Sequence, residues 1–479
     1  MVKQSVKSII KANLNNEMAV AIVKLVETPS VAIKINLSSF LIVTSSLSAY
    51  LLIQSCLSYL SYEVLTTTRV VSEVTSVFPK ITLCNLNPFT SRDSLHFLAE
   101  IDRTQFALLN DETALNSLSY QEKHSLFRGF YGSALREMNR RNLSNISHNF
   151  DDIILSCKFN QEDCSTKEDF QLTFDKSYGA CIVFNSGFNM QNRPVPLKKS
   201  LFSGFVYRLE VELYVNFHEN LTYLNSYNLG RGAIVRIENN SYLSDDASEV
   251  HAAPGHYTSI TVDRSFKFYM AKPYSRCDLD NDSPADSSSK LFKLIKSSEY
   301  AYKAQLCYSQ CYQSLLVNDC NCTDWYIVSL FDRQKCFNRS QLACNDRVFR
   351  KYINSSFFEQ NCLPLCPLEC NQSQFRVRSS ASQLIGEKYL DFLRNNSRLK
   401  EDFVARKLDS RTAQESFVKI GVYYESLSYE MSTESAKMDV VSMLANIGGN
   451  LGLFLGVSVL SLCELIGVAL EILVNIKKK

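Results

Sequence analysis

The residues best suited to chemistry lie in the apolar segment near the C-terminus, from Val440 to Ile476. Two carboxylates, Glu464 and Glu471, stand inside it. An acid at the centre of a bilayer costs roughly 2.5–3.5 kcal/mol on insertion scales, so such acids usually line a water-filled path. The two acids therefore indicate that this segment does more than anchor the chain in a membrane.

Four glycines precede the two acids in the same segment: Gly448, Gly449, Gly452 and Gly456. A simple membrane anchor would favour Leu and Val at these positions, so the glycines also indicate more than anchoring. Helix packing stays open as an alternative, because Gly452 and Gly456 match the G-x-x-x-G spacing of packed membrane helices.

Composition and motifs exclude several other functions. The 479 residues carry a formal net charge of +2, whereas a nucleic-acid-binding domain normally has a basic excess on one face. The chain contains no H-E-x-x-H, Walker-loop or G-x-S-x-G motif. We therefore expect neither an enzyme nor a cofactor or resident metal.

A second apolar segment, Ile35–Leu60, contains no charged residue and exceeds the roughly 20 residues that cross a bilayer as a helix. A cleavable signal peptide fits less well, because its apolar part has only about 7–15 residues. Lysines flank both segments on their terminal sides: Lys3, Lys7, Lys11, Lys24, Lys34, Lys477, Lys478 and Lys479. Because Lys and Arg favour the cytoplasmic side, both termini are predicted to be cytoplasmic in a plasma-membrane protein.

The predicted organisation follows from these two spans. A cytoplasmic tail (1–34) precedes the first span (35–60), and an extracellular domain (61–439) leads to the second span (440–474) and a short tail (475–479). Of the 16 cysteines, only Cys56 and Cys463 fall within the spans. The remaining even number, in an oxidising compartment, predicts seven disulfides.

Zinc binding is the alternative for Cys307-x3-Cys311 and Cys320-x-Cys322, but no His stands at ligand spacing. The extracellular domain also carries sequons for N-glycosylation. These are Asn142, Asn145, Asn220, Asn239, Asn281, Asn321, Asn338, Asn354, Asn371 and Asn395.

Strand and helix patterns alternate along the extracellular domain. Strand-like runs are Lys80–Leu83, Cys181–Phe184, Phe205–Val215, Ala233–Ile237, Tyr257–Val262 and Phe266–Met270, and Ser416–Tyr429 is predicted to be a final pair of strands. Residues 93–150, 290–375 and 379–407 have helical patterns instead. The predicted fold is an α+β membrane protein with two transmembrane helices and a large disulfide-rich α/β ectodomain. That ectodomain combines a helical finger-like part (93–150), a central β part (178–275) and a cysteine-stapled helical thumb-like part (290–375).

Six motifs in order along the chain resemble the degenerin/epithelial sodium channel superfamily, which includes amiloride-sensitive, acid-sensing and peptide-gated channels. They are Phe78–Phe89 (FPKITLCNLNPF), Leu155–Cys164 (LSCKFNQEDC), Tyr178–Asn185 (YGACIVFN), Cys307–Cys322, Val422–Glu430 (VYYESLSYE) and Gly448–Ser458 (GGNLGLFLGVS). The resemblance implies a homo- or hetero-trimer with related subunits, embedded in membrane lipid. Three second spans would line one pore, with Na⁺ as the permeant ion.

The resemblance also implies the disulfide pairing, which sequence alone leaves open. The pairs would be Cys84–Cys181, Cys157–Cys164, Cys277–Cys370, Cys307–Cys366, Cys311–Cys362, Cys320–Cys344 and Cys322–Cys336. The last five are nested and would stiffen the helical thumb-like part.

By the same resemblance, Gly456, Val457 and Ser458 form the selectivity filter, where the helix breaks and backbone carbonyls face the ion. Glu464 would contribute a carboxylate ring further inward. Glu471, seven residues on, lies on the same helix face, and an interfacial solvated charge is its alternative role.

Further pore or gate residues implied by the resemblance are Ala445, Asn446, Gly449 and Gly452. Ala445 keeps the small residue of the degenerin position, where a bulky side chain would wedge the gate open, and Asn446 replaces an Asp of acid-sensing members. Four acids could raise the cation concentration at the outer mouth or form a solvated acidic face: Glu425, Glu430, Glu434 and Asp439.

Gating residues follow from the resemblance as well. Tyr62 and Tyr274 fall near an aromatic contact that couples the ectodomain to the first span. Leu427 and Ser428 match a short linker that switches during desensitisation.

Three departures from the family pattern concern gating. Ser30-Val31 stands where the family has a His-Gly pair, Ser61–Leu65 lacks the histidines of proton-gated members, and Tyr352–Asn361 offers a single Glu. Proton gating is therefore not supported. An extracellular peptide or matrix ligand, mechanical force and constitutive opening stay open as stimuli.

The predicted function is a trimeric, amiloride-sensitive, sodium-preferring cation channel gated through its ectodomain. The alternatives are a non-conducting two-span surface receptor or adhesion protein, and a silent subunit of a hetero-trimer.

Overall fold

The computed structural model describes residues 29–456, with gaps. The gaps are 90–91, 104–129, 131, 139–149, 165, 176–177, 216–230, 241–247, 279–288, 299, 301, 325–326, 337–338, 385–388, 390, 392–394 and 396–414. The chain divides into two compact units. We call residues 1–67, 269–276 and 433–479 the helix unit, and residues 68–268 and 277–432 the sheet unit.

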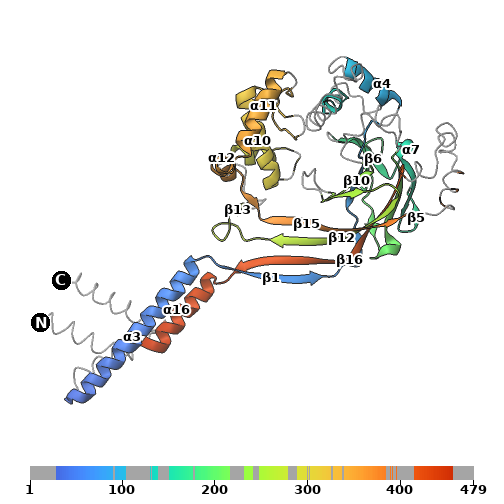
Figure 1. Ribbon diagram of the computed structural model, residues 1–479. Helices are drawn as coiled ribbons and strands as arrows, with labels where there is room; N and C mark the ends of the chain where they lie inside the picture. The colour runs from blue at the N-terminus through green and yellow to red at the C-terminus, as the bar shows by residue number, and fades with distance from the viewer. Residues whose placement is uncertain are drawn as a thin grey trace, which may run out of the picture. The chain divides into compact units, whose positions relative to one another are not determined.

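Two apolar helices, α3 (Val31–Leu60) and α16 (Val440–Leu455), pack side by side in the helix unit (Figure 1). Within the described residues, α3 alone is long and apolar enough to cross a membrane, and only 6% of its most apolar window is buried. Phe40 and Ile42 are 68% and 66% exposed. This exposure is unlike that of a core helix in a soluble domain.

The start of α3 differs from the sequence-based boundary. The helix begins at Val31 rather than Ile35, because Val31, Ala32 and Ile33 extend the apolar run. Lys34 is accommodated in the first turns, since a long lysine stem can lie along apolar surface while its ammonium group reaches water.

The larger sheet of the sheet unit has the strand order β15-β12-β16-β9-β4-β5, and β1 also pairs with β16. Its strands are β1 (Val64–Val71), β4 (Ile154–Phe159), β5 (Glu162–Asp163), β9 (Leu209–Tyr214), β12 (His256–Phe268), β15 (Asn371–Gln383) and β16 (Phe417–Ala436). The first and last of these strands are the segments that follow α3 and precede α16 along the chain.

The smaller sheet has five strands in the order β11-β10-β3-β7-β6. They are β3 (Lys80–Asn85), β6 (Phe170–Asp175), β7 (Gly179–Phe184), β10 (Ala233–Glu238) and β11 (Ser248–Ala252). Two short pairs add to them: β2 (Ser76–Val77) with β8 (Lys199–Ser200), and β13 (Cys277–Asp278) with β14 (Leu368–Glu369).

The two sheets share one hydrophobic core. Ile81 and Phe184 come from the smaller sheet, Val211 and Ile420 come from the larger one, and all four are at most 1% exposed. Burial of apolar surface stabilises a fold by roughly 25 cal/mol per Å², and this free energy is the main contribution that holds the two sheets together.

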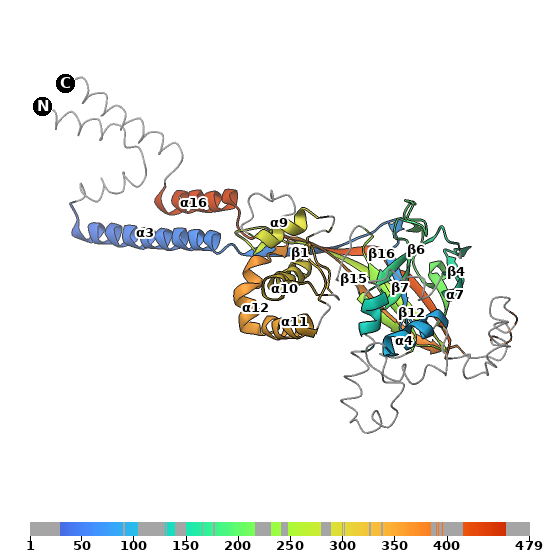
Figure 2. The same cartoon turned by 90° about the horizontal axis from the view of Figure 1, so that it is seen from above.

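Helices gather in two places in the sheet unit. Figure 2 shows one lobe formed by α9 (Lys290–Lys296), α10 (Ala304–Cys320), α11 (Arg339–Tyr352) and α12 (Ser355–Asn361). The short 3-10 helix η5 (Leu363–Leu365) follows α12. Elsewhere, α4 (Arg92–Ile101) packs against helical residues in 130–138, and α7 (Phe150–Ile153) precedes β4.

Seven disulfides brace the sheet unit. They are Cys84–Cys181, Cys157–Cys164, Cys277–Cys370, Cys307–Cys366, Cys311–Cys362, Cys320–Cys344 and Cys322–Cys336. These are the pairs that the family resemblance implies. With all of these cysteines paired, the alternative of a zinc site at Cys307, Cys311, Cys320 and Cys322 is ruled out.

Three local predictions are wrong. Phe205–Tyr207 is a 3-10 turn (η3) rather than the start of a strand, because Gly204 turns the chain with a φ of 92°. Tyr257–Val262 and Phe266–Met270 are not separate strands, since β12 runs unbroken through Phe268. Residues 371–375 and 379–383 are not helical, because β15 pairs with β12 along its whole length.

Candidate functional site

Small residues form a stripe along one face of α16. Ala445, Gly449, Gly452 and Gly456 follow one another at i, i+4, i+7 and i+11, a spacing that places them on one face of a helix. Ala445, Gly449 and Gly452 are exposed, and a Cβ atom on Gly449 would meet nothing within 4 Å. This face of α16 is therefore not covered by the described residues of the chain.

The opposite face of α16 is partly buried. Ile447, Leu451 and Phe454 have the same helical spacing, about half a turn away from the stripe, and all three are half-buried. Because α16 packs against α3, the larger apolar side chains serve that contact and leave the small residues free. Asn446 is exposed beside the stripe.

α16 has well-defined ends. Asp439 caps the N-terminus by accepting a hydrogen bond from the Ser442 N–H at 2.8 Å. Hydrogen bonds from the Ser442 side chain and from this N–H lower the pKa of the Asp439 carboxyl. At the other end Gly456 adopts a left-handed conformation, with φ 65° and ψ 21°, and its N–H bonds the Gly452 carbonyl. A residue with a Cβ is disfavoured in this conformation, so glycine suits the point where the helix stops. Val457, Ser458, Glu464 and Glu471 lie outside the described residues.

Tyr62 and Tyr274 are in contact within the helix unit. Their rings meet edge to face, with centroids 5.5 Å apart and planes at 86°. The Tyr274 loop is held by Glu434, whose Oε2 accepts a hydrogen bond from the Met270 N–H at 3.0 Å. Nearby on the same unit, Lys437 Nζ lies 2.6 Å from Glu63 Oε2. The loop 269–276 is thereby tied both to the end of α3 and to the end of β16.

Leu427 and Ser428 do not form a linker between strands. Both lie inside the continuous strand β16, and Leu427 is 9% exposed as part of the shared core. Its backbone carbonyl accepts a hydrogen bond from Arg264, a residue that the sequence pattern does not single out.

The acids expected at an outer mouth are engaged in local contacts. Glu425 pairs with Arg378, and Glu430 Oε2 lies 2.8 Å from a nitrogen of Arg376. Since Glu434 bonds the Met270 N–H and Asp439 caps α16, each of these acids has a local structural role.

Two carboxylates of β9 have pKa values shifted in opposite directions. Burial raises the pKa of Glu212, whose Oε2 accepts a hydrogen bond from Ser156 Oγ at 3.1 Å while Oε1 has no partner among the described residues. Burial alone would also raise the pKa of Glu210, but hydrogen bonds from Lys419 and Arg208 outweigh it and lower that pKa. The charge of Glu210 is therefore well compensated by its partners, whereas the charge of Glu212, two residues along the same strand, is poorly compensated.

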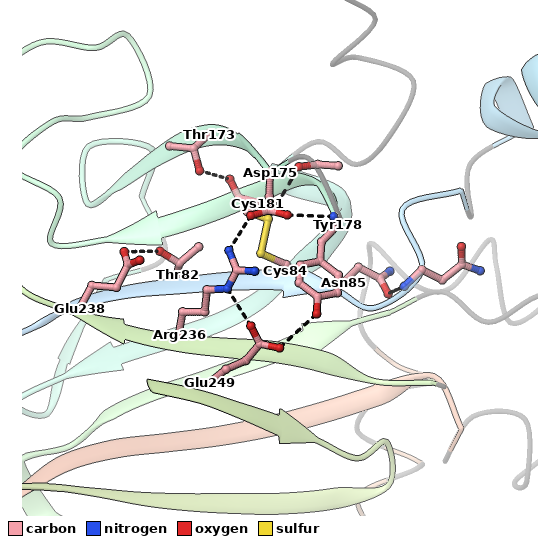
Figure 3. The surroundings of a disulfide bond; sticks show 12 residues. Thr82, Cys84, Asn85, Thr173, Asp175, Tyr178, Cys181, Arg236, Glu238 and Glu249 are labelled. Carbon is pink, nitrogen blue, oxygen red and sulfur yellow. Dashed lines mark hydrogen bonds and ion pairs between the residues drawn. A yellow bond between two sulfur atoms is a disulfide. The ribbon is translucent and has the colours of Figure 1, made fainter. Parts of the chain in front are cut away.

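An ion-pair network covers the Cys84–Cys181 disulfide (Figure 3). Arg236 on β10 bonds both Asp175 on β6 and Glu249 on β11, and its guanidinium lies 5.2 Å from the centroid of the Tyr178 ring. The Tyr178 hydroxyl donates to Glu249 at 3.1 Å, and burial together with Glu249 raises the pKa of Tyr178 to about 12. The network joins both edges of the smaller sheet and thereby stabilises it.

Five of the ten sequons lie in the described residues. Asn321, Asn354, Asn371 and Asn395 are exposed. Asn239 is half-buried, and its Nδ2, the atom that would carry a glycan, lies 3.3 Å from Ser373 Oγ. The other five lie outside the described residues: Asn142, Asn145, Asn220, Asn281 and Asn338.

The sequence matches the family described as "Amiloride-sensitive sodium channel" over residues 24–468, nearly the whole chain. The chain belongs to this family. It is a family of membrane ion channels rather than enzymes. In this chain, apolar helices near both ends enclose a mixed α/β, disulfide-rich domain, as the family fold requires.

Individual relatives are degenerins and acid-sensing ion channels. The chain is 27% identical to "Degenerin mec-10" of Caenorhabditis elegans over 375 residues, which cover 77% of this chain and 46% of that protein. It is 24% identical to "Acid-sensing ion channel 1" of Gallus gallus over 435 residues, covering 87% and 74%. The chain thus spans about half the length of the degenerin relatives that it matches.

The solved structure of a proton-activated chloride channel aligns with 90% of this chain and 96% of that one. The TM-score is 0.33 and the identity is 6%, a likeness too low to support an argument about this amiloride-sensitive sodium channel family member.

Proposed function

We propose that the chain is a subunit of a trimeric, amiloride-sensitive, sodium-preferring cation channel of the plasma membrane. Family membership supports the channel class. The observation that carries the finer proposal is the exposed small-residue stripe of α16, which ends at a left-handed Gly456. Three such stripes around a threefold axis would line a path wide enough for a cation.

We propose that the filter lies where α16 stops. The last carbonyls of a helix have no intrahelical partner and carry partial negative charge, so they can replace part of an ion's hydration shell. Gly456, Val457 and Ser458 are the proposed filter, and Ala445, Asn446, Gly449 and Gly452 line the path before it. Glu464 would form the inner carboxylate ring, and Glu471 a weaker second one.

The sheet unit is proposed to be extracellular, with both termini in the cytoplasm. Seven disulfides in one unit support an oxidising compartment, and four exposed sequons are accessible to glycosylation. Stimuli that act on the sheet unit would reach the helices through Tyr62 and Tyr274 and through β16, which contains Leu427 and Ser428.

Whole-cell recording of the chain expressed alone tests the proposal. We expect a sodium current that amiloride blocks, and a larger standing current when Ala445 on the stripe is replaced by Phe. Leu444→Phe is the matched control, because Leu444 is exposed but lies off the stripe. Surface biotinylation verifies that each variant reaches the membrane.

The alternatives predict different outcomes. A silent subunit gives no current alone but changes the current of a co-expressed relative. A non-conducting receptor does neither, with or without Ala445→Phe, and that result at normal surface levels would contradict the channel proposal.

A further inference from the structure

Arg264 on β12 joins parts of the sheet unit that are far apart in sequence. One terminal nitrogen, Nη2, donates to Glu73 Oε2 at 2.8 Å and to the backbone carbonyl of Leu427 at 2.9 Å. The side chain is only 11% exposed, so both bonds are shielded from water. A charged group at such a site requires these partners, because a buried charge without them is costly.

Aromatic rings enclose the same guanidinium. It lies 5.1 Å from the ring centroid of Tyr424 and 5.3 Å from that of Tyr429, both on β16. Cation–π contacts of this kind strengthen as water is excluded. Arg264 therefore contacts β16 through two rings and one carbonyl, and contacts the segment after β1 through Glu73.

The contacted segments are those that lead to the two apolar helices. Glu73 comes two residues after β1, which follows α3 in the chain, and Leu427 lies in β16, which precedes α16. Beyond the end of β1 at Val71, Ser72 Oγ lies 3.3 Å from Ser428 Oγ. Within β1, Thr68 Oγ1 lies 2.9 Å from Ser432 Oγ.

We propose that Arg264 is a gating latch, which holds the segment after β1 against β16 where the pairing of the two strands has ended. Its release lets the two segments separate at Ser72 and Ser428, while the paired part at Thr68 and Ser432 stays together. The gating role rests on the proposed channel function, whereas the latch itself is a property of the fold.

Paired cysteines test the latch without any current. In the purified full-length chain, the two new cysteines of the Ser72→Cys/Ser428→Cys variant are expected to oxidise to a disulfide. A maleimide mass tag, which reacts with free thiols, should therefore label this variant no more than it labels the parent chain. The two hydroxyl oxygens, 3.3 Å apart, stand close to where the cysteine sulfurs would lie, so a small side-chain movement brings the sulfurs to bonding distance. Adding Arg264→Gln should raise the tagged fraction several-fold.

Two controls keep the result specific. Arg264→Lys retains a charged nitrogen with several donors, and since the Arg264 Nε has no partner among the described residues, it should preserve most of the bridge. Thr68→Cys with Ser432→Cys should stay bridged in the Arg264→Gln background. Equal tagging of both pairs would mean general loosening, and unchanged tagging of the Ser72–Ser428 pair would mean no latch. Either result overturns the proposal.

Recording then tests the gating role. Mild reduction should change the current of the Ser72→Cys/Ser428→Cys channel but not that of the Thr68→Cys/Ser432→Cys channel. Identical responses would restrict Arg264 to a structural role. If the parent chain passes no current, the channel proposal fails in its homomeric form, while the tagging result still decides the latch.

Discussion

The ring of Tyr62 stands perpendicular to the ring of Tyr274, with centroids 5.5 Å apart. The residues are more than two hundred positions apart, and Tyr62 holds a left-handed backbone with φ 51° just after α3 ends. Such a conformation is uncommon for a residue with a Cβ atom and persists only when the surroundings favour it. The contact with Tyr274 is one such favourable interaction.

Removing the Tyr274 ring should uncouple the loop 269–276 from α3. We expect Tyr274→Ala to reduce stimulus-evoked or amiloride-sensitive current, and Tyr274→Phe to retain it, because the ring contact needs no hydroxyl. A double-mutant cycle with Tyr62→Ala should give a coupling energy of about 0.5–1.5 kcal/mol. Additive effects of the two alanine substitutions would mean that the ring contact does not contribute to gating.

Substitutions in the proposed filter should alter permeation. Gly456→Trp is expected to abolish current, because a bulky side chain at a left-handed position both strains the end of α16 and fills the path. Ser458→Cys should change the Na⁺/K⁺ permeability ratio or the block by amiloride. Reversal potentials measured in mixed solutions check both, and unchanged ratios in both variants would place the filter elsewhere.

The two acids of the proposed pore, Glu464 and Glu471, should contribute unequally to conductance. Glu464→Gln is expected to lower single-channel conductance more than Glu471→Gln, because only Glu464 is proposed as the inner ring. The two variants are each other's controls, since they remove the same charge from the same segment. The reverse ranking would move the ring to Glu471.

Glu210 and Glu212 should give opposite pH dependences of stability. Burial raises the pKa of Glu212 above 4.5, so the folded chain loses stability as pH rises from about 4.5 through the raised value. Glu212→Gln removes that loss and should gain most over the parent chain at neutral pH. The pKa of Glu210 is lowered by Lys419 and Arg208, so Glu210→Gln should cost most at neutral pH and least at low pH.

Thermal unfolding of the detergent-solubilised chain at several pH values checks this pair of predictions. The pH should range from about 4 to about 7, because carboxyl groups ordinarily titrate near pH 4. Parallel curves for Glu210→Gln and Glu212→Gln would show that the two sites do not differ in their surroundings.

Strand prediction from the sequence succeeded where burial leaves a clear pattern. Lys80–Leu83 alternates polar and apolar residues and Cys181–Phe184 is apolar throughout, and they become part of β3 and β7, which pair with each other in the core. It failed in β15, whose sequence NQSQFRVRSSASQ contains only Phe375 and Val377 as large apolar residues. That strand forms because β12 offers a partner along its whole length, and such pairing is not visible in local sequence.

The candidate site shows the same division. The stripe of Ala445, Gly449 and Gly452 can be predicted, because helical spacing alone places these residues together. The contact of Arg264 with the Leu427 carbonyl cannot, since it joins a side chain to a backbone atom 163 residues away. Backbone acceptors leave no signature in residue types.

The five bridges around the helical lobe enclose one another without crossing. Their sequence separations are 14, 24, 51, 59 and 93, and each loop contains the smaller ones. Because the entropy cost of closing a loop rises with its length, the innermost pair closes most readily, and each closed bridge shortens the search for the next. The lobe can therefore oxidise from the inside outward during biosynthesis, with each bridge closing the shortest native loop that is still open.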